Sequence, residues 1–184
     1  MEKEDYADLI NMMPSSWILS YDELKDILPL SWPFIEFGLV HGFIKANVAV
    51  CFCLDEISRK GYSEESDTSL LCATDDADVL ISVSCRLSDD ERNGSNARSQ
   101  WMRVLLWLCC TRENDIKRQL DWVELIYAEF DYPNEVAPFV RYMPSNKIKT
   151  SEESAKALRT YLDEWRTSFM NRMSSPEGGA DADR

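Results

Sequence analysis

The side chains with the most obvious catalytic potential are one histidine and several adjacent pairs of carboxylates. His41 is the only histidine of the chain and lies in the stretch Leu-Val-His-Gly, where a helix is expected to end. A histidine base needs a nucleophile or an acid partner, but neither a Gly-x-Ser-x-Gly motif nor a cysteine–histidine signature accompanies it. Because a helix C-terminus itself stabilises an imidazolium ion, we interpret His41 as structural.

The carboxylate pairs Asp55–Glu56 and Asp75–Asp76 could bind magnesium or act as general acid and base. Adjacent residues on a helix point in different directions, so each pair needs a distant third group. A Gly-rich phosphate loop is missing, because the six glycines are scattered or lie in the tail. We therefore predict no catalytic residue, cofactor or metal ion, and keep a metal-assisted hydrolase that uses surface carboxylates as an alternative function.

Cysteines could also bind a metal or form disulfides. They form no Cys-x-x-Cys pair, and no histidine lies near them to complete a zinc site. The chain begins MEKEDYADL, without the basic and apolar regions of a signal peptide, so we expect a cytoplasmic protein with reduced thiols that behave as small hydrophobic side chains. The six cysteines are Cys51, Cys53, Cys72, Cys85, Cys109 and Cys110.

The overall charge narrows the choice of partner. A formal net charge of −13 and a pI near 4.5 argue against binding to nucleic acid, since phosphates require basic patches. An acidic surface attracts basic proteins and accelerates encounter with them. Alternatively, the charge only keeps a chain with six tryptophans in solution.

Residues 62–92 carry more than half of this net charge. This stretch, called the acidic stretch below, has nine acids against Arg86 and Arg92, a net charge of −7 in 31 residues. We predict that its acids form the partner-binding surface. They are Glu64, Glu65, Asp67, Asp75, Asp76, Asp78, Asp89, Asp90 and Glu91.

The elements that must position these side chains are predicted to be helices. The chain length fits one domain over 1–173, an all-α bundle of six to eight helices, followed by a disordered, Gly-rich tail over 174–184. The longest apolar runs have seven residues, against about 20 needed to span a membrane. A strand remains an alternative for 45–60 and 79–85, where β-branched residues cluster.

Capping signals and the spacing of apolar residues predict where the other helices lie. Ser20 and Thr150 each precede a glutamate by three residues, as in a capping box. The segment that starts at Trp101 is apolar on all sides and should occupy the centre of the bundle. The predicted helices cover about 20–27, 31–42, 45–60, 79–85, 101–109, 116–130 and 150–169.

The stretch YAEFDYPNEVAPFVRYMP (127–144) connects the last two helices. We predict that Pro133 stops one helix, that Asn134 caps a short segment through Tyr142, and that Asp131 pairs with Arg141 across the corner. Since no partnered nucleophile or base accompanies it, we interpret this stretch as a determinant of conformation rather than a site.

Parts of that stretch are specific enough to suggest a family. The pieces FDYP and FVRYMP, with Leu30-Ser31-Trp32 and Phe37-Gly38 through Ile44 upstream, resemble a bacterial family of small proteins of unknown activity over about 28–170. Some members of such families are similar to immunity proteins of polymorphic or contact-dependent growth-inhibition systems. The resemblance implies binding of a cognate toxin C-terminal domain in the cytoplasm, and it supplies no catalytic residues.

Charge and resemblance lead to one hypothesis. Toxins that cut nucleic acid present basic clefts, and an inhibitor can fill such a cleft with carboxylates in place of phosphates. We therefore expect the acidic stretch to bind a basic toxin, with neither a nucleic acid nor a membrane as partner. A helical adaptor for another basic client protein is a further alternative.

Overall fold

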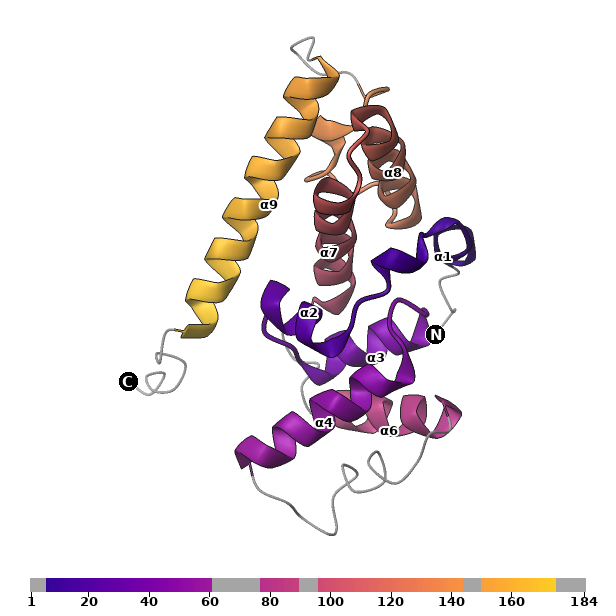
Figure 1. Ribbon diagram of the computed structural model, residues 1–184, viewed down its shortest axis with the longest axis vertical. Helices are drawn as coiled ribbons and strands as arrows, with labels where there is room; N and C mark the ends of the chain where they lie inside the picture. Colours follow the sequence, from indigo (N-terminus) through magenta and orange to yellow (C-terminus); the bar gives the residue numbers. More distant parts are fainter. Residues whose placement is uncertain (1–5, 61–76, 90–95, 144–149, 175–184) are drawn as a thin grey trace, which may run out of the picture.

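The computed structural model describes residues 6–60, 77–89, 96–143 and 150–174, and all regular structure in these ranges is helical (Figure 1). The predicted all-α fold is confirmed. The described ranges hold eight α-helices and two short 3-10 helices. They are α1 (Ala7–Met12), η1 (Ser15–Trp17), α2 (Tyr21–Ile27), α3 (Trp32–Val40), α4 (Ala46–Lys60), α6 (Ala77–Asp89), α7 (Ala97–Arg112), α8 (Ile116–Glu129), η2 (Ala137–Phe139) and α9 (Ser151–Ser174).

Both predicted capping boxes form. At the start of α2, the Glu23 amide donates to the Ser20 hydroxyl at 3.4 Å, and the Glu23 carboxylate accepts from the Ser20 amide at 2.9 Å. At the start of α9, Thr150 and Glu153 make the same two bonds at 3.2 and 2.8 Å. These bonds satisfy amides that a helix N-terminus otherwise leaves without an acceptor.

The two segments for which a strand was the alternative are helices. α4 and α6 each bury one β-branched residue in the core, Val48 in α4 and Val83 in α6. Tertiary packing thus overrides the weak β preference of these residues. α9 extends to Ser174, and residues 175–184 of the predicted tail lie outside the described residues.

Helix α7 lies at the centre of the bundle, as its apolar sequence predicted. It packs against α3, α8 and α9, and Figure 1 shows it enclosed between α9 and α8. Between residues 101 and 110 only Arg103 and Trp107 are partly exposed, so little of this helix faces water. Its buried side chains are Trp101, Met102, Val104, Leu105, Leu106, Leu108, Cys109 and Cys110.

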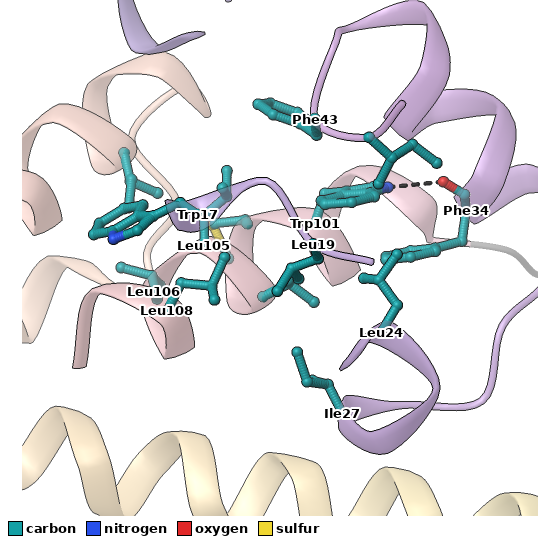
Figure 2. Packing of buried hydrophobic residues seen from close by; sticks show 14 of the residues in the cluster. Trp17, Leu19, Leu24, Ile27, Phe34, Phe43, Trp101, Leu105, Leu106 and Leu108 are labelled. Atoms are coloured by element: carbon teal, nitrogen blue, oxygen red, sulfur yellow. Dashed lines mark hydrogen bonds between the residues drawn. The ribbon is translucent and has the colours of Figure 1, made fainter. Parts of the chain in front are cut away.

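Trp101 joins α7 to α3 by three kinds of contact. Its indole is stacked on the ring of Phe34, with centroids 4.4 Å apart and an interplanar angle of 3°. Its Nε1 donates a hydrogen bond of 2.8 Å to the backbone oxygen of Phe34 (Figure 2). A Cβ at Gly38 would lie 2.5 Å from Cζ2 of this indole, so only glycine leaves room for it.

Helix α6 packs along α3 and thereby connects the end of the acidic stretch to the core. Leu80 and Val83 fill the interface, and the small residues Ser84 and Ser88 on the same side are completely buried. In Figure 1, α4 and α6 lie together at one end of the molecule, below α3. No helix in the described ranges is long and apolar enough to cross a membrane.

Replacement of Gly38 tests the contact with Trp101. In most helices Gly→Ala stabilises by up to about 1 kcal/mol. Here we expect Gly38→Ala to lower the free energy of unfolding by about 1–3 kcal/mol, because the new methyl group overpacks against the indole. Denaturant unfolding measures this change.

A double-mutant cycle provides the control. Trp101→Phe replaces the indole by a smaller ring and so leaves room for the new methyl group. Gly38→Ala should therefore lower the free energy of unfolding clearly less in the Trp101→Phe background than in the natural chain. If Gly38→Ala lowers the free energy of unfolding equally in the two backgrounds, the indole is not what excludes a side chain at Gly38.

Candidate functional site

The predicted binding residues lie mostly outside the described residues. Two of them, Asp78 and Asp89, are residues of helix α6, which begins at Ala77 and ends at Asp89. The structure therefore fixes where the acidic stretch meets the core, while the partner-binding surface stays a prediction. Outside the described residues lie Glu64, Glu65, Asp67, Asp75, Asp76, Asp90 and Glu91.

The residues considered for catalysis have structural neighbours. The ring of His41 lies against the rings of Tyr6 and Phe37, with centroids 4.8 and 4.3 Å away, and His41 follows the last residue of α3. Among the described residues, no group of three or more histidine, cysteine, aspartate or glutamate side chains is placed to hold a metal ion. No disulfide joins any two of the five cysteines within the described ranges, and Cys72 lies outside them.

The pair Asp55–Glu56 takes part in ion pairs on α4. Asp55 contacts the Lys25 ammonium group of α2 at 3.3 Å, and Arg59 contacts both acids. A hydrogen bond from Tyr21, followed by the charges of Lys25 and Arg59, holds the pKa of Asp55 below its usual value. Asp55 thereby connects α2 with α4.

The most unusual backbone of the described residues occurs at the end of α8. Asp131 and Tyr132 have φ angles of 58° and 54°, in the left-handed region that residues other than glycine rarely adopt. The Asp131 amide donates to Ala128 O at 3.2 Å, and the Tyr132 amide donates to Tyr127 O at 2.9 Å. These two bonds form a Schellman motif, which ends α8 at Glu129. The prediction that Pro133 stops this helix was wrong, because the left-handed turn comes first.

Arg98 holds this turn in place. Its guanidinium group donates to the Asp131 carboxylate at 2.7 Å, to the Phe130 backbone oxygen at 3.2 Å and to the Tyr6 hydroxyl at 2.9 Å. It also lies over the Phe130 ring, 5.4 Å from the centroid. One side chain at the start of α7 therefore joins the N-terminal segment to the end of α8.

Arg141 holds the segment after η2 against the side of α8. Its guanidinium group bonds both oxygens of the Glu124 carboxylate, at 2.7 and 2.9 Å, and also bonds Asp121. The predicted pair between Asp131 and Arg141 was wrong, since each residue has a different partner. The short segment predicted to run from a cap at Asn134 through Tyr142 was also wrong, because the regular structure there is limited to η2 (Ala137–Phe139).

Pro138 accounts in part for that last error. It has no amide hydrogen to continue a helical ladder, and only the single 3-10 turn η2, which contains Pro138, forms between Pro133 and Val140. The rest of the segment follows the surface of α8 as turns, held by Arg141.

These two anchored segments bring three tyrosines together, called the tyrosine surface below. The rings of Tyr132 and Tyr142 are 59% and 58% exposed, while Tyr127 is buried beneath them. The centroid of Tyr127 lies 5.3 Å from that of Tyr132 and 6.4 Å from that of Tyr142. Desolvation, the other two phenols and the Glu124 carboxylate all raise the pKa of Tyr142, so its phenol is neutral at physiological pH.

Sequence reasoning missed the tyrosine surface because its parts are brought together by Arg98 and Arg141. The available signal was the density of aromatic residues in the stretch 127–144 itself. Exposed tyrosines on a fixed backbone are typical of protein interfaces, since a tyrosine gives a large contact area with few rotatable bonds.

Comparison with known proteins places this architecture in a family. Residues 21–168 match the family DUF2247, which is described as "Uncharacterized protein conserved in bacteria". The chain belongs to this family. The match runs from α2 to α9 and includes Arg98 and the tyrosine surface. Neither a curated protein nor a solved structure gave a significant match to this DUF2247 protein.

The predicted resemblance to a bacterial family of unknown activity is therefore confirmed. The match extends over 21–168, close to the range of about 28–170 that the motifs indicated. The family match therefore covers the described helices from α2 to α9 and is not confined to one part of the chain.

Arg98→Lys tests the anchor of the left-handed turn. A lysine keeps the charge but cannot donate to three acceptors from one planar group, so we expect a loss of about 1–3 kcal/mol in the free energy of unfolding. Denaturant unfolding monitored by tryptophan fluorescence gives this value.

Arg118→Lys is the matched control. Arg118 is an exposed residue on the outer side of α8, and we expect a change within about 0.5 kcal/mol there. Equal stabilities of the Arg98→Lys variant and the natural protein would refute the anchor.

Proposed function

We propose that this DUF2247 protein is an immunity protein that binds and neutralises a cognate bacterial toxin domain. The observation that carries the proposal is the acidic stretch, with a net charge of −7 in residues 62–92. Charge of one sign concentrated in so short a segment creates a local field that selects a partner of the opposite sign.

The attachment of α6 supports this role. α6 contributes the only part of the acidic stretch within the described residues, and its buried side chains Leu80 and Val83 belong to the hydrophobic core. The packing of α6 along α3 holds the backbone of this part of the acidic stretch in a constant position relative to the core. Binding groups on a rigid element lose less conformational entropy on association.

The proposed mechanism is competition for a basic cleft. A toxin that cuts nucleic acid binds phosphates through lysine and arginine, and carboxylates of the acidic stretch take the place of those phosphates. Attraction between a chain of net charge −13 and a basic domain speeds association, and salt weakens this effect by screening. The inhibitor needs no catalytic group of its own for this purpose.

A helical adaptor for an unrelated basic client would use the same charges. Protection of growing cells separates the two functions, because only an immunity protein must rescue a cell that expresses the toxin domain. The proposal predicts a toxin gene directly beside the gene of this protein, and that gene would supply the domain to be used.

Neutralisation of five acids tests the acidic stretch. We expect the variant to bind the basic toxin domain on the order of 100-fold more weakly, since each lost charge pair contributes about 0.5–1 kcal/mol. Isothermal titration calorimetry at two salt concentrations measures the dissociation constant and its salt dependence. The variant combines Asp75→Asn, Asp76→Asn, Asp78→Asn, Asp89→Asn and Asp90→Asn.

The control changes the net charge by the same amount elsewhere. It should retain an affinity within a few-fold of the natural protein, because the total charge is equal and only its position differs. If both variants lose the same affinity for the toxin domain, the position of the charges has no effect on binding. That result would refute the assignment of binding to the acidic stretch. The control combines Asp8→Asn, Asp22→Asn, Asp26→Asn, Asp163→Asn and Glu164→Gln, all at exposed positions.

A further inference from the structure

The tyrosine surface is exposed although it contains large apolar rings. Among the described residues, six large hydrophobic side chains are exposed, and two of them are Tyr132 and Tyr142. Both are in contact with the same buried ring, that of Tyr127. The other four exposed side chains are Met12, Leu54, Val79 and Met170.

Each exposed ring is held from a separate side. Tyr132 belongs to the left-handed turn, whose neighbouring Asp131 is bonded to Arg98 at 2.7 Å. Tyr142 follows Arg141, which is bound to Glu124 through both carboxylate oxygens. Left-handed backbone at two successive residues costs free energy, and such strain is concentrated at functional sites. The left-handed turn places the ring of Tyr132 at the surface, and the Arg141 ion pairs hold the backbone beside Tyr142.

The chemistry of this surface suits a cation. The face of a tyrosine ring carries negative potential, and the phenol oxygens and carboxylates nearby accept hydrogen bonds from N–H groups. Asp131 precedes Tyr132 and is paired with Arg98, while Asp121 and Glu124 are paired with Arg141, which precedes Tyr142. These five side chains together carry one net negative charge, on a protein with a net charge of −13.

Among cationic side chains, arginine fits best. Its planar guanidinium group stacks on an aromatic face and still directs N–H groups sideways towards oxygen acceptors. A lysine ammonium group is compact and strongly hydrated, so it loses more hydration free energy than a guanidinium group on contact with an exposed ring.

We infer that the tyrosine surface is a docking site for an arginine side chain of a basic partner protein. The inference deepens the proposed function, because it gives the basic toxin domain a second point of contact, on elements other than α6. Only the identity of this partner as a toxin rests on the proposed function. Recognition of arginine by the rings stands on the geometry of the tyrosine surface.

Peptide titration of the full chain tests the inference directly. The probe is the peptide Gly-Arg-Gly-Arg-Gly with an acetylated N-terminus and an amidated C-terminus. Its binding is detected by NMR, through the resonances of Tyr132 and Tyr142 of the protein. We expect these resonances to shift in a saturable manner, with an affinity at least about threefold higher than for the peptide with lysine in place of arginine. Equal affinities of the two peptides would overturn the inference, as would stronger binding of the peptide with leucine at both positions.

Variants identify the groups responsible. Tyr132→Phe and Tyr142→Phe keep the ring faces and should retain most of the binding, whereas Tyr132→Asn with Tyr142→Asn should abolish the preference for arginine. Asparagine tolerates a positive φ better than most residues, and thermal unfolding checks that the variant is folded. Leu54→Ala removes an equally exposed side chain on α4 and should leave binding unchanged. Unaltered binding by the double asparagine variant would refute the site.

A last comparison separates this inference from the proposed function. If the arginine peptide binds at the tyrosines while the toxin domain does not bind the natural protein, the proposed function fails and the docking site stands. If the toxin domain binds the natural protein and the double asparagine variant equally well, the docking site fails and the proposed function stands.

Discussion

The indole of Trp101 occupies the space that a side chain at Gly38 would need, and the arrangement of the helices depends on this contact. Its stack on Phe34 and its hydrogen bond to the Phe34 backbone oxygen fix the distance between α3 and α7. α3 carries α6, where the acidic stretch meets the core. The same helix α7 carries Arg98 one turn earlier, where it holds the end of α8. Both candidate binding surfaces therefore depend on one junction.

The two surfaces use different physical effects. The acidic stretch acts through long-range charge, which steers a partner and is sensitive to salt. The tyrosine surface acts at short range, through rings that the turn after α8 and the Arg141 ion pairs hold in position. Short-range contacts of rigid aromatic groups mainly reduce the rate of dissociation, while charges mainly increase the rate of association. In the proposed function, the two surfaces together give an inhibitor that finds its partner quickly and releases it slowly.

Much of the fold could be predicted because its signals are local. Ser20 and Glu23, like Thr150 and Glu153, lie three residues apart, so the sequence itself specifies the bonds that start α2 and α9. The apolar character of α7 likewise indicated its central position without any knowledge of its neighbours.

The errors concern interactions over long sequence distances. Nothing near Asp131 marks a left-handed turn, because its stabilising partner Arg98 lies 33 residues earlier and the turn contains no glycine. Arg141 has an acid ten residues before it, which suggested a local pair, but it bonds Glu124 on the side of α8. The tyrosine surface follows from these two pairings and could not be predicted without them. For the acidic stretch, the sequence established the charge but not the position of its carboxylates.

The most direct measurement is amide hydrogen exchange of the full chain, alone and saturated with the basic toxin domain that the proposed function predicts as its partner. If the central claim is correct, exchange of the amides in residues 62–92 slows in the complex, since the partner covers the acidic stretch. A saturated complex in which these amides exchange as fast as in the free chain would contradict it.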